Sequence, residues 1–302
     1  MGKRKKDRKN VEKRSIMFHL YFNPYLKDSY TRIYDVLLET HHRTYDTVHK
    51  NINENPQLVH DVFLKEAEKN VFNGFYSEDI DPGDYYEQLQ EYVFERMEEQ
   101  SLMHYQFELM SLSNLYQVFE QQLRKWLFEE MTNKHNEYIN QIRFVLDDDE
   151  KDYGKFYSKF GQLENVLKEM NLTFTIPLFQ TEDMLVLAKL FGNVEDNGEE
   201  IPIVETEIWE VIRECNLISN TFKHGSGYSA IELHKLHPEY FEKVSDTKLM
   251  NLYRTTNMEK VLCVDKIYFE KYSNAMKEFW MKLKTHQSGS IMLDINISPN
   301  EE

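Results

Sequence analysis

The sequence predicts a mainly α-helical fold with at most a minor β element. Glycine (10) and proline (7) are scarce in these 302 residues, at about half of their usual shares of roughly 7% and 5%, and few turn residues favour long helices over many-stranded sheets. One apolar repeat has spacings that alternate between three and four residues, as on one face of a helix. Its members are Leu102, Tyr105, Leu109, Leu112, Tyr116, Phe119, Leu123 and Trp126. The repeat predicts a long helix buried within a domain, although a coiled-coil seam between two chains has the same pattern.

Shorter elements precede this helix. Residues 15–26 are aromatic and interrupted by Pro24, which indicates an irregular lead-in or a short strand. Apolar residues at helical spacing predict a helix over 30–50 and a second from Pro56 to a turn at Asn73 and Gly74. The Asp-Pro-Gly-Asp sequence at 81–84 predicts a break before the long helical region.

Helical patterns resume in the second half of the chain, with one loop and one strand among them. We expect helices at 163–170, 184–191, 205–224 and 267–283, a polar loop at 193–203, and a strand at 291–297. Gly225-Ser226-Gly227 ends the third of these helices. The expected organisation is an N-terminal helical region with a basic arm at 1–95, a helical domain at 96–290 and a tail at 291–302.

Charge and composition limit the class of protein. Lys plus Arg number 36 and Asp plus Glu 52, so the net charge of −16 repels phosphate at long range and excludes a general nucleic-acid coating protein. The basic arm, Lys3 to Arg14, could contact RNA, but such a run is more typical of a disordered, solubilising tail. No apolar stretch is long enough for a membrane span, and two cysteines, Cys215 and Cys263, give no disulfide framework. We therefore expect a cytoplasmic protein with both cysteines buried and no membrane partner.

Motifs for cofactors and metals are absent. There is no glycine-rich nucleotide loop, no P-loop and no HExxH or GxSxG sequence, so no cofactor is expected. The acidic run Asp147–Asp152 lacks the spacing of a calcium loop and fits a solvated loop; a metal-dependent hydrolase that uses it is a weaker alternative. His234 and His237 lack neighbouring ligands at metal-site spacing, which indicates a surface role and no metal.

One segment, residues 213–225, combines polar groups on a single helical face. Asn220 and His224 lie one turn apart, and Arg213 lies two turns before Asn220 on the same stripe. The apolar positions of this segment point elsewhere, toward the core: Ile212, Cys215, Ile218 and Phe222. A structural explanation is available too, because Lys223 and His224 complement the C-terminal helix dipole and Gly225 caps the helix.

Asn220-Thr221-Phe222-Lys223-His224 resembles the Asn-x-x-x-His half of the motif of the HEPN superfamily, and the similarity extends over residues 95–285. This resemblance implies a helical domain whose active members dimerise into a metal-independent endoribonuclease. It assigns acid–base catalysis to His224 and orientation of that histidine to Asn220. The family's arginine is replaced here by Ser219, so stabilisation of the phosphate charge passes to Lys223, Arg213 or the basic arm.

The functional hypothesis is a HEPN-like protein of the abortive-infection or toxin type, a ribonuclease of antiviral defence that acts on RNA as a homodimer. The alternative is a non-catalytic helical interaction protein that binds a partner protein in a defence complex. Ser219 and the acidic net charge favour this alternative, while the Asn220 and His224 pair favours the nuclease.

Overall fold

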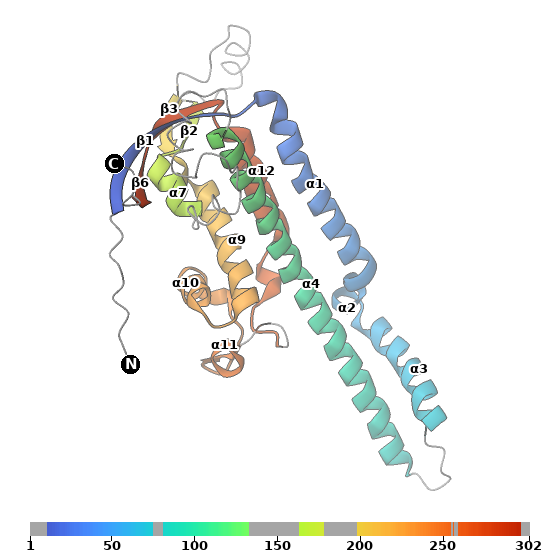
Figure 1. Cartoon of the computed structure of the whole chain (residues 1–302). Helices are drawn as coiled ribbons and strands as arrows, with labels where there is room; N and C mark the ends of the chain where they lie inside the picture. The colour runs from blue at the N-terminus through green and yellow to red at the C-terminus, as the bar shows by residue number, and fades with distance from the viewer. Residues whose placement is uncertain are drawn as a thin grey trace, which may run out of the picture. The chain divides into compact units, whose positions relative to one another are not determined.

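The computed structural model describes residues 11–74, 81–132, 163–177, 198–254, 256 and 259–296 (Figure 1). It confirms a mainly α-helical fold with small β elements. The chain divides into two compact units, each assembled from several stretches of sequence. Unit 1 comprises Met1–Thr31, Val118–Glu210 and Met276–Glu302, and unit 2 comprises Arg32–Gln117 and Val211–Ala275.

The helix predicted over 30–50 is a nearly continuous run of three segments. It comprises α1 (Lys27–Thr44), the π-helical turn η2 (Tyr45–His49) and α2 (Lys50–Glu54). The next helix, α3 (Pro56–Gly74), ends at the predicted Asn-Gly pair. The predicted break at 81–84 is itself a helix start, because Pro82 occupies the first position of α4 (Pro82–Thr132) and Asp81 accepts a hydrogen bond from the Gly83 amide at 2.7 Å.

Helix α4 carries the apolar repeat, and the repeat is buried within the chain. Leu102 is half-buried and the other seven members are 0–8% exposed. The domain boundary predicted at residue 95 lies inside this helix and stays a prediction. A small separate core joins α3 to the first part of α4 and contains Phe63, Ala67, Leu89 and Val93.

The remaining helices agree with the sequence patterns wherever the structure describes them. They are α7 (Leu163–Met170), α9 (Glu207–His224), α10 (Tyr228–Leu236), α11 (Leu249–Tyr253) and α12 (Phe269–Lys282), with 3-10 turns η1 (Pro24–Leu26), η3 (Ile203–Glu205), η4 (Pro238–Tyr240) and η5 (Val264–Lys266). The helix predicted at 184–191 lies outside the described residues. No helix among those described is apolar over a length that could cross a bilayer.

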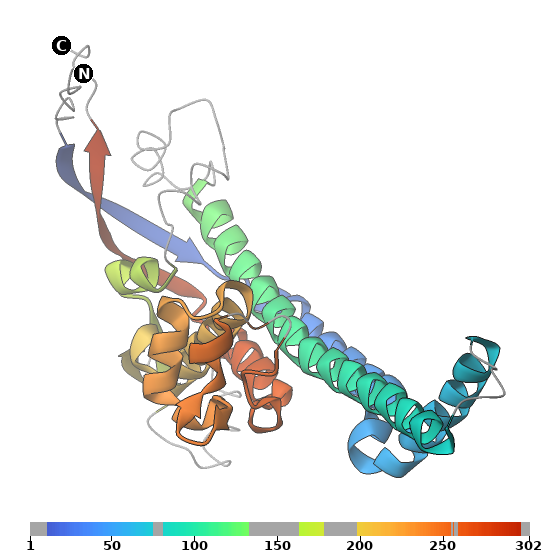
Figure 2. The same ribbon diagram turned by 90° about the horizontal axis from the view of Figure 1, so that it is seen from below.

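The strands form three two-stranded antiparallel sheets, and they correct two sequence expectations. The longest sheet pairs β1 (Val11–Tyr21) with β6 (His286–Asn296), so residues 11–14 of the basic arm belong to a strand rather than a tail (Figure 2). Alternation explains this ribbon, because Phe18 and Leu20 are buried while Met17 and Tyr21 are exposed.

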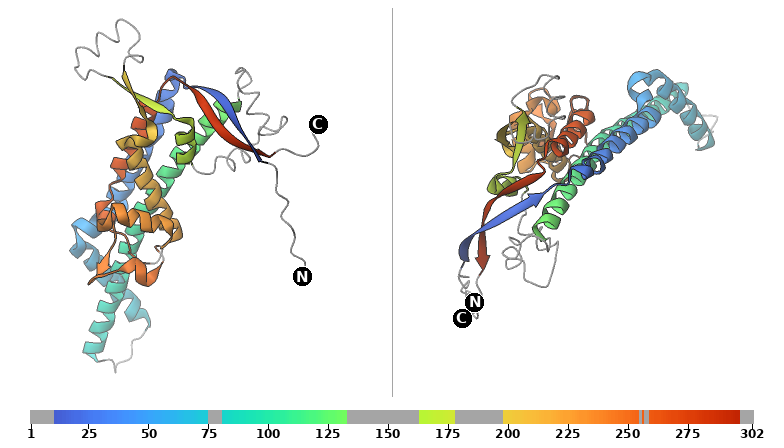
Figure 3. Two further views of the ribbon diagram at one scale, coloured as in Figure 1. Left: turned by 90° about the vertical axis from the view of Figure 1, so that its left-hand side faces the viewer. Right: turned by 90° about the horizontal axis from the view of Figure 1, so that it is seen from above.

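The second correction concerns the polar loop expected at 193–203, whose last part is a strand. There β3 (Gly198–Pro202) pairs with β2 (Thr173–Pro177) (Figure 3). The shortest sheet joins β4 (Lys243–Val244) to β5 (Thr247–Lys248).

Each unit has its own core. In unit 1, aromatic rings gather around Trp280, which is fully buried; its ring neighbours are Phe22, Tyr30, Phe119, Trp126 and Phe279. In unit 2, α4 packs against α9, where Cys215 is fully buried and its thiol donates to the Leu112 carbonyl at 3.8 Å. Cys263 was expected to be buried as well, but it is only half-buried.

Candidate functional site

The predicted site residues all lie on α9, on the face that the sequence assigned to them. Arg213, Lys223 and His224 are exposed, whereas Asn220 is half-buried. The Asn220 amide donates to the side-chain oxygen of Asn216, one turn earlier, at 2.6 Å. The core-facing residues Ile212, Cys215 and Ile218 are completely buried, and Phe222 is half-buried. The structure thus presents a polar stripe whose C-terminal end, at His224, is open to solvent.

Ser219 lies on the opposite face of α9 and is completely buried. Its hydroxyl is 3.0 Å from the hydroxyl of Ser113 on α4, so the two side chains satisfy each other inside unit 2. A charged group at position 219 would point into this core rather than toward His224. A cation that serves the polar stripe must therefore come from another position.

The turn after α9 is joined to the backbone of one cationic residue, Arg254. Gly225 adopts a left-handed conformation with φ of 68°, and its amide donates to the Thr221 carbonyl at 2.8 Å. The chain then turns so that the Ser226 amide donates to the carbonyl of Arg254, the residue that ends α11, at 3.2 Å. A hydrogen bond from the Thr256 hydroxyl to the Phe222 carbonyl fastens the same junction. The backbone of Arg254, distant in sequence, is thereby held beside the end of α9.

Two exposed aromatic residues flank this junction. Tyr228 opens α10 directly after the turn and is 75% exposed, and Tyr253, which precedes Arg254, is 46% exposed. We refer to Lys223, His224, Tyr228, Tyr253 and Arg254 as the α9 turn surface. Sequence reasoning missed the last three. Tyr253 and Arg254 reach this turn through the hydrogen bonds from Ser226 to Arg254 and from Thr256 to Phe222, which join residues 28 and 34 positions apart. Tyr228 alone had a signal in the sequence, as the first residue after a Gly-Ser-Gly turn.

The electrostatics of this surface differ from those of the whole chain. Residues 211–275 contain nine Lys or Arg and eight Asp or Glu, which gives a segment charge of +1 within a chain of −16. Among the described residues, Lys223, His224 and Arg254 make no ion pair, whereas the nearby Lys235 is paired with Glu232 at 2.7 Å. The α9 turn surface therefore offers cationic groups that no carboxylate neutralises within the described part of the chain.

The geometry of Gly225 gives a first prediction. Because a Cβ atom is disfavoured in the left-handed region, Gly225→Ala should lower the free energy of unfolding by about 1–2 kcal/mol. Urea denaturation followed by circular dichroism measures this change. Gly227, at φ of −84° with open space around its Cα, is the matched control, and Gly227→Ala should have a much smaller effect. Equal losses in the two variants would contradict a cap that depends on glycine at position 225.

On its buried side α9 carries a polar network that the sequence analysis did not foresee. Glu214 is 6% exposed and accepts hydrogen bonds from the Tyr240 hydroxyl at 2.9 Å, the Tyr272 hydroxyl at 2.5 Å and the Lys271 ammonium at 2.8 Å. His237 Nε2 is 3.2 Å from the same carboxylate. Burial alone would raise the pKa of Glu214, but its hydrogen bonds to Lys271, Tyr272 and Tyr240 outweigh burial and lower the pKa. This network joins α9, η4 and α12 and keeps the helix of the candidate site in place.

Other sequence candidates do not form a centre of reactivity. His237 belongs to the Glu214 network and also contacts Glu239 at 3.0 Å, whereas His234 packs edge-on against Phe241. The acidic run at 147–152 lies outside the described residues. Across the ranges that the structure does describe, no three His, Cys, Asp or Glu side chains are arranged to hold a metal ion.

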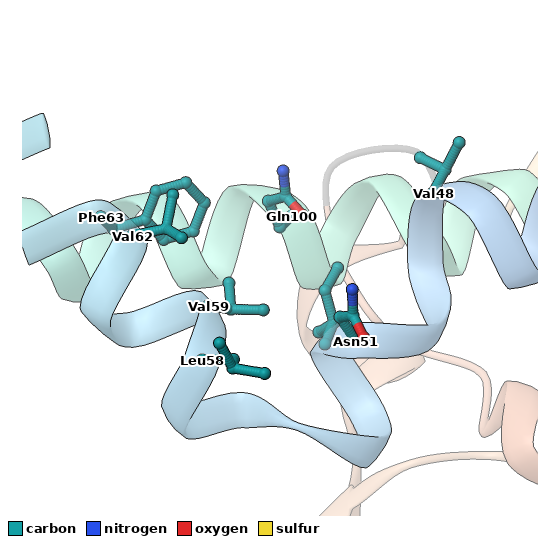
Figure 4. A pocket seen from close by; sticks show the side chains of 8 residues that line it. Val48, Asn51, Leu58, Val59, Val62, Phe63 and Gln100 are labelled. Carbon is teal, nitrogen blue, oxygen red and sulfur yellow. The ribbon is translucent and has the colours of Figure 1, made fainter.

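One pocket, of about 260 Å³, lies in unit 2 away from these residues (Figure 4). Its wall is formed mainly by Val48, Ile52, Leu58, Val59, Val62 and Phe63, with the amides of Asn51 and Gln100 as the polar groups. No acid, base or nucleophile lines it, so it contributes no chemistry to the candidate site.

Comparison of the chain with models of protein families, with curated proteins and with solved structures gives no match.

Proposed function

We propose that this chain is a HEPN-like protein of the defence or toxin type that contacts RNA through the α9 turn surface and uses His224 as its acid–base residue. The observation that carries the proposal is the grouping of exposed Lys223, His224 and Arg254, none of them neutralised by a described carboxylate, around one turn of an acidic protein. The Asn-x-x-x-His pattern of Asn220 and His224 supports it. We also propose a cytoplasmic homodimer, in line with what the resemblance implies.

The chemistry follows from these groups. Positive side chains attract the phosphates of RNA, and tyrosine rings offer planes on which unpaired bases stack. An exposed histidine can take the proton of a ribose 2′-hydroxyl, whose oxygen then attacks the adjacent phosphorus. The bond from phosphorus to the 5′-oxygen breaks, solvent water protonates this oxygen, and a 2′,3′-cyclic phosphate remains. We assign to Lys223 and Arg254 the stabilisation of the phosphate charge, the role that an arginine at position 219 would otherwise have.

Cleavage of total RNA in the presence of EDTA tests the catalytic part of the proposal. We expect the purified protein to cleave RNA and His224→Ala to lower the rate by about 100-fold or more, the usual contribution of a general acid–base group. His42→Ala is the matched control, because His42 is also exposed and lies on α1. The dimer is tested by the mass of the protein in solution. Unchanged cleavage by His224→Ala would contradict the assignment of His224.

Salt dependence of RNA binding tests the surface separately from catalysis. Three phosphate contacts on single-stranded RNA correspond to a slope of about −2 in the logarithm of affinity against the logarithm of salt concentration. The double variant Lys223→Glu, Arg254→Glu removes two of the three contacts and should flatten the slope to about −0.7. The control Lys125→Glu, on the exposed side of α4, should leave the slope unchanged. A slope that is the same in the double variant and the wild type would place RNA binding elsewhere.

A non-catalytic interaction protein is the second candidate function, and the burial of Ser219 favours it. The position of the family's arginine faces the α4 core, so one catalytic group of the motif is missing from the stripe. In this case the exposed Tyr228 and Tyr253 would contact a partner protein. A folded, RNA-binding protein without cleavage would support this second function.

A further inference from the structure

Unit 2 contains a buried cluster of three histidines and one glutamate that the proposed function does not use. His41 comes from α1, His49 from η2, and His104 and Glu108 from α4; all four are 6–9% exposed. His41 Nε2 is 3.0 Å from one Glu108 oxygen, and His104 Nε2 is 3.4 Å from the other. One carboxylate thus faces two histidines, and the third is close by, with the His49 and His104 ring centroids 5.3 Å apart.

Aromatic packing encloses the cluster. The His41 ring stacks between Phe107 and Phe269, at centroid distances of 5.0 and 4.3 Å, and the His49 ring stacks on Phe107 at 4.9 Å. These neighbours exclude water and offer no hydrogen bonds. In the described structure Nδ1 of His41 and Nδ1 of His49 are buried without a hydrogen-bond partner, and Nε2 of His104 has only its 3.4 Å contact with Glu108. Buried polar atoms without partners are uncommon in folded proteins and need an explanation.

The backbone is unusual at the same place. Residues Tyr45–His49 form a π-helical turn between α1 and α2, and such turns are rare and frequently coincide with functional sites. His49 is the last residue of the turn and the only one of the five that is buried. The π-helical turn therefore coincides with the point at which the chain brings His49 into the cluster.

The pKa values of two members, His49 and Glu108, are lowered, so the folded cluster binds few protons. Burial lowers the pKa of His49 below its ordinary value of 6.5, and the neighbouring His104 and His41 lower it further, against an opposing effect of Glu108. Burial would raise the pKa of Glu108, but its contacts with His104 and His41 dominate and hold that pKa at about 2. The titratable groups that face His49 are thus His41 on α1, and His104 and Glu108 on α4; Tyr45 on η2 contacts His104, and α12 contributes only the Phe269 ring.

We propose that His41, His49, His104 and Glu108 form a proton-operated latch, which holds α1 and η2 against α4 near neutral pH and releases them when His49 is protonated. Since one carboxylate cannot neutralise three imidazolium ions, added protons create unpaired buried charge, and the cluster escapes it by opening to water. A histidine with a lowered pKa binds its proton more readily in the open state, so stability is lost as the pH falls below 6.5. Glu108 adds a second loss, which begins only below pH 4.5.

Urea unfolding between pH 7.5 and pH 5.0 tests the latch, with amide hydrogen exchange at residues 41–49 and 104–108 as the local readout. Below pH 6.5, one extra proton in the open state raises the opening equilibrium constant by up to about tenfold per pH unit. We expect this rise in the wild type and a much smaller one in His49→Phe, which keeps a ring on Phe107 but cannot titrate. His49→Gln is the second variant in case the larger ring does not fit. His60→Gln, on α3 with Asp61 as its contact and outside the cluster, is the control and should behave as the wild type.

Two results would overturn the latch. The first is a pH dependence in His49→Phe and His49→Gln that equals that of the wild type. The second is stabilisation of the wild type by added Zn²⁺ that EDTA reverses and His49→Phe abolishes, because the cluster would then be a metal site and not a proton site. The latch would be supported if, as the pH falls, amide exchange at residues 41–49 and 104–108 accelerated in the wild type before global unfolding and did not accelerate in the His49 variants.

Discussion

Glu214→Ala should lower the free energy of unfolding by about 2–6 kcal/mol, because two buried tyrosine hydroxyls would each be left without an acceptor at a cost of about 1–3 kcal/mol. The loss follows from what remains after the carboxylate is removed. The hydroxyls of Tyr240 and Tyr272 and the ammonium of Lys271 all donate to Glu214 in the native structure, and each would lose its acceptor. Tyr272 is completely buried, so water cannot replace this acceptor without opening the fold. Urea denaturation monitored by circular dichroism measures the change.

The matched control is Glu210→Ala, one turn earlier on α9, where the side chain is exposed and the expected change is within about 0.5 kcal/mol. Acid should affect the two proteins differently. Because the pKa of Glu214 is lowered in the fold, its contribution is present above pH 4.5 and disappears as the pH falls below that value. Wild type and Glu214→Ala should therefore converge in stability in acid. A constant difference between them from pH 7 to pH 3 would contradict a charged Glu214.

The Glu214 network also shows why part of the fold could be predicted from the sequence and part could not. The apolar repeat of α4 and the pattern of α9 are local, since residues three and four positions apart share a helical face whatever their surroundings. The predicted burial of Ile212, Cys215 and Ile218 is confirmed for this reason. Glu214 directly precedes Cys215 on the same helix. Nothing in the local sequence distinguishes it from Glu210, which is exposed. Its burial depends on Tyr240, Lys271 and Tyr272, which are 26 to 58 positions away.

The pairing of β1 with β6 could not be predicted from the sequence either, because it too depends on residues far apart in the chain. The sequence of Val11–Arg14 fits the end of a charged arm, and it forms a strand because β6 supplies pairing partners 279 to 285 positions later. The candidate site divides similarly. Asn220 and His224 could be identified from spacing along one helix, while Arg254 reaches the same turn through the hydrogen bonds from Ser226 to Arg254 and from Thr256 to Phe222. The role of Ser219 could be judged only after α4 was seen to bury it.

Trp280→Ala should lower the free energy of unfolding by about 3–5 kcal/mol, through lost apolar burial and the cavity that a large buried ring leaves. The ring is 0% exposed and lies in the core of unit 1, with centroids 4.5 Å from Tyr30, 5.4 Å from Phe279 and 5.5 Å from Phe22. Phe22 and Tyr30 belong to the N-terminal stretch of this unit and Trp280 to its C-terminal stretch, so the ring links the two ends of the chain. Urea denaturation by circular dichroism measures the loss.

Trp280→Phe tests whether the loss of stability depends on the volume of the side chain or on the presence of an aromatic ring. It keeps a ring near Tyr30 and leaves a smaller cavity, so its loss should be clearly below that of the alanine variant. Met281→Ala, at the next position but 49% exposed, controls for a general effect of truncation in α12 and should change stability by no more than about 0.5 kcal/mol. Helix α12 also carries Lys271 and Tyr272, which belong to the Glu214 network of unit 2. If Trp280→Ala unfolded in two steps, the core of unit 1 would unfold separately from that of unit 2. A single step with a loss as small as that of Met281→Ala would contradict the central position of Trp280 in unit 1.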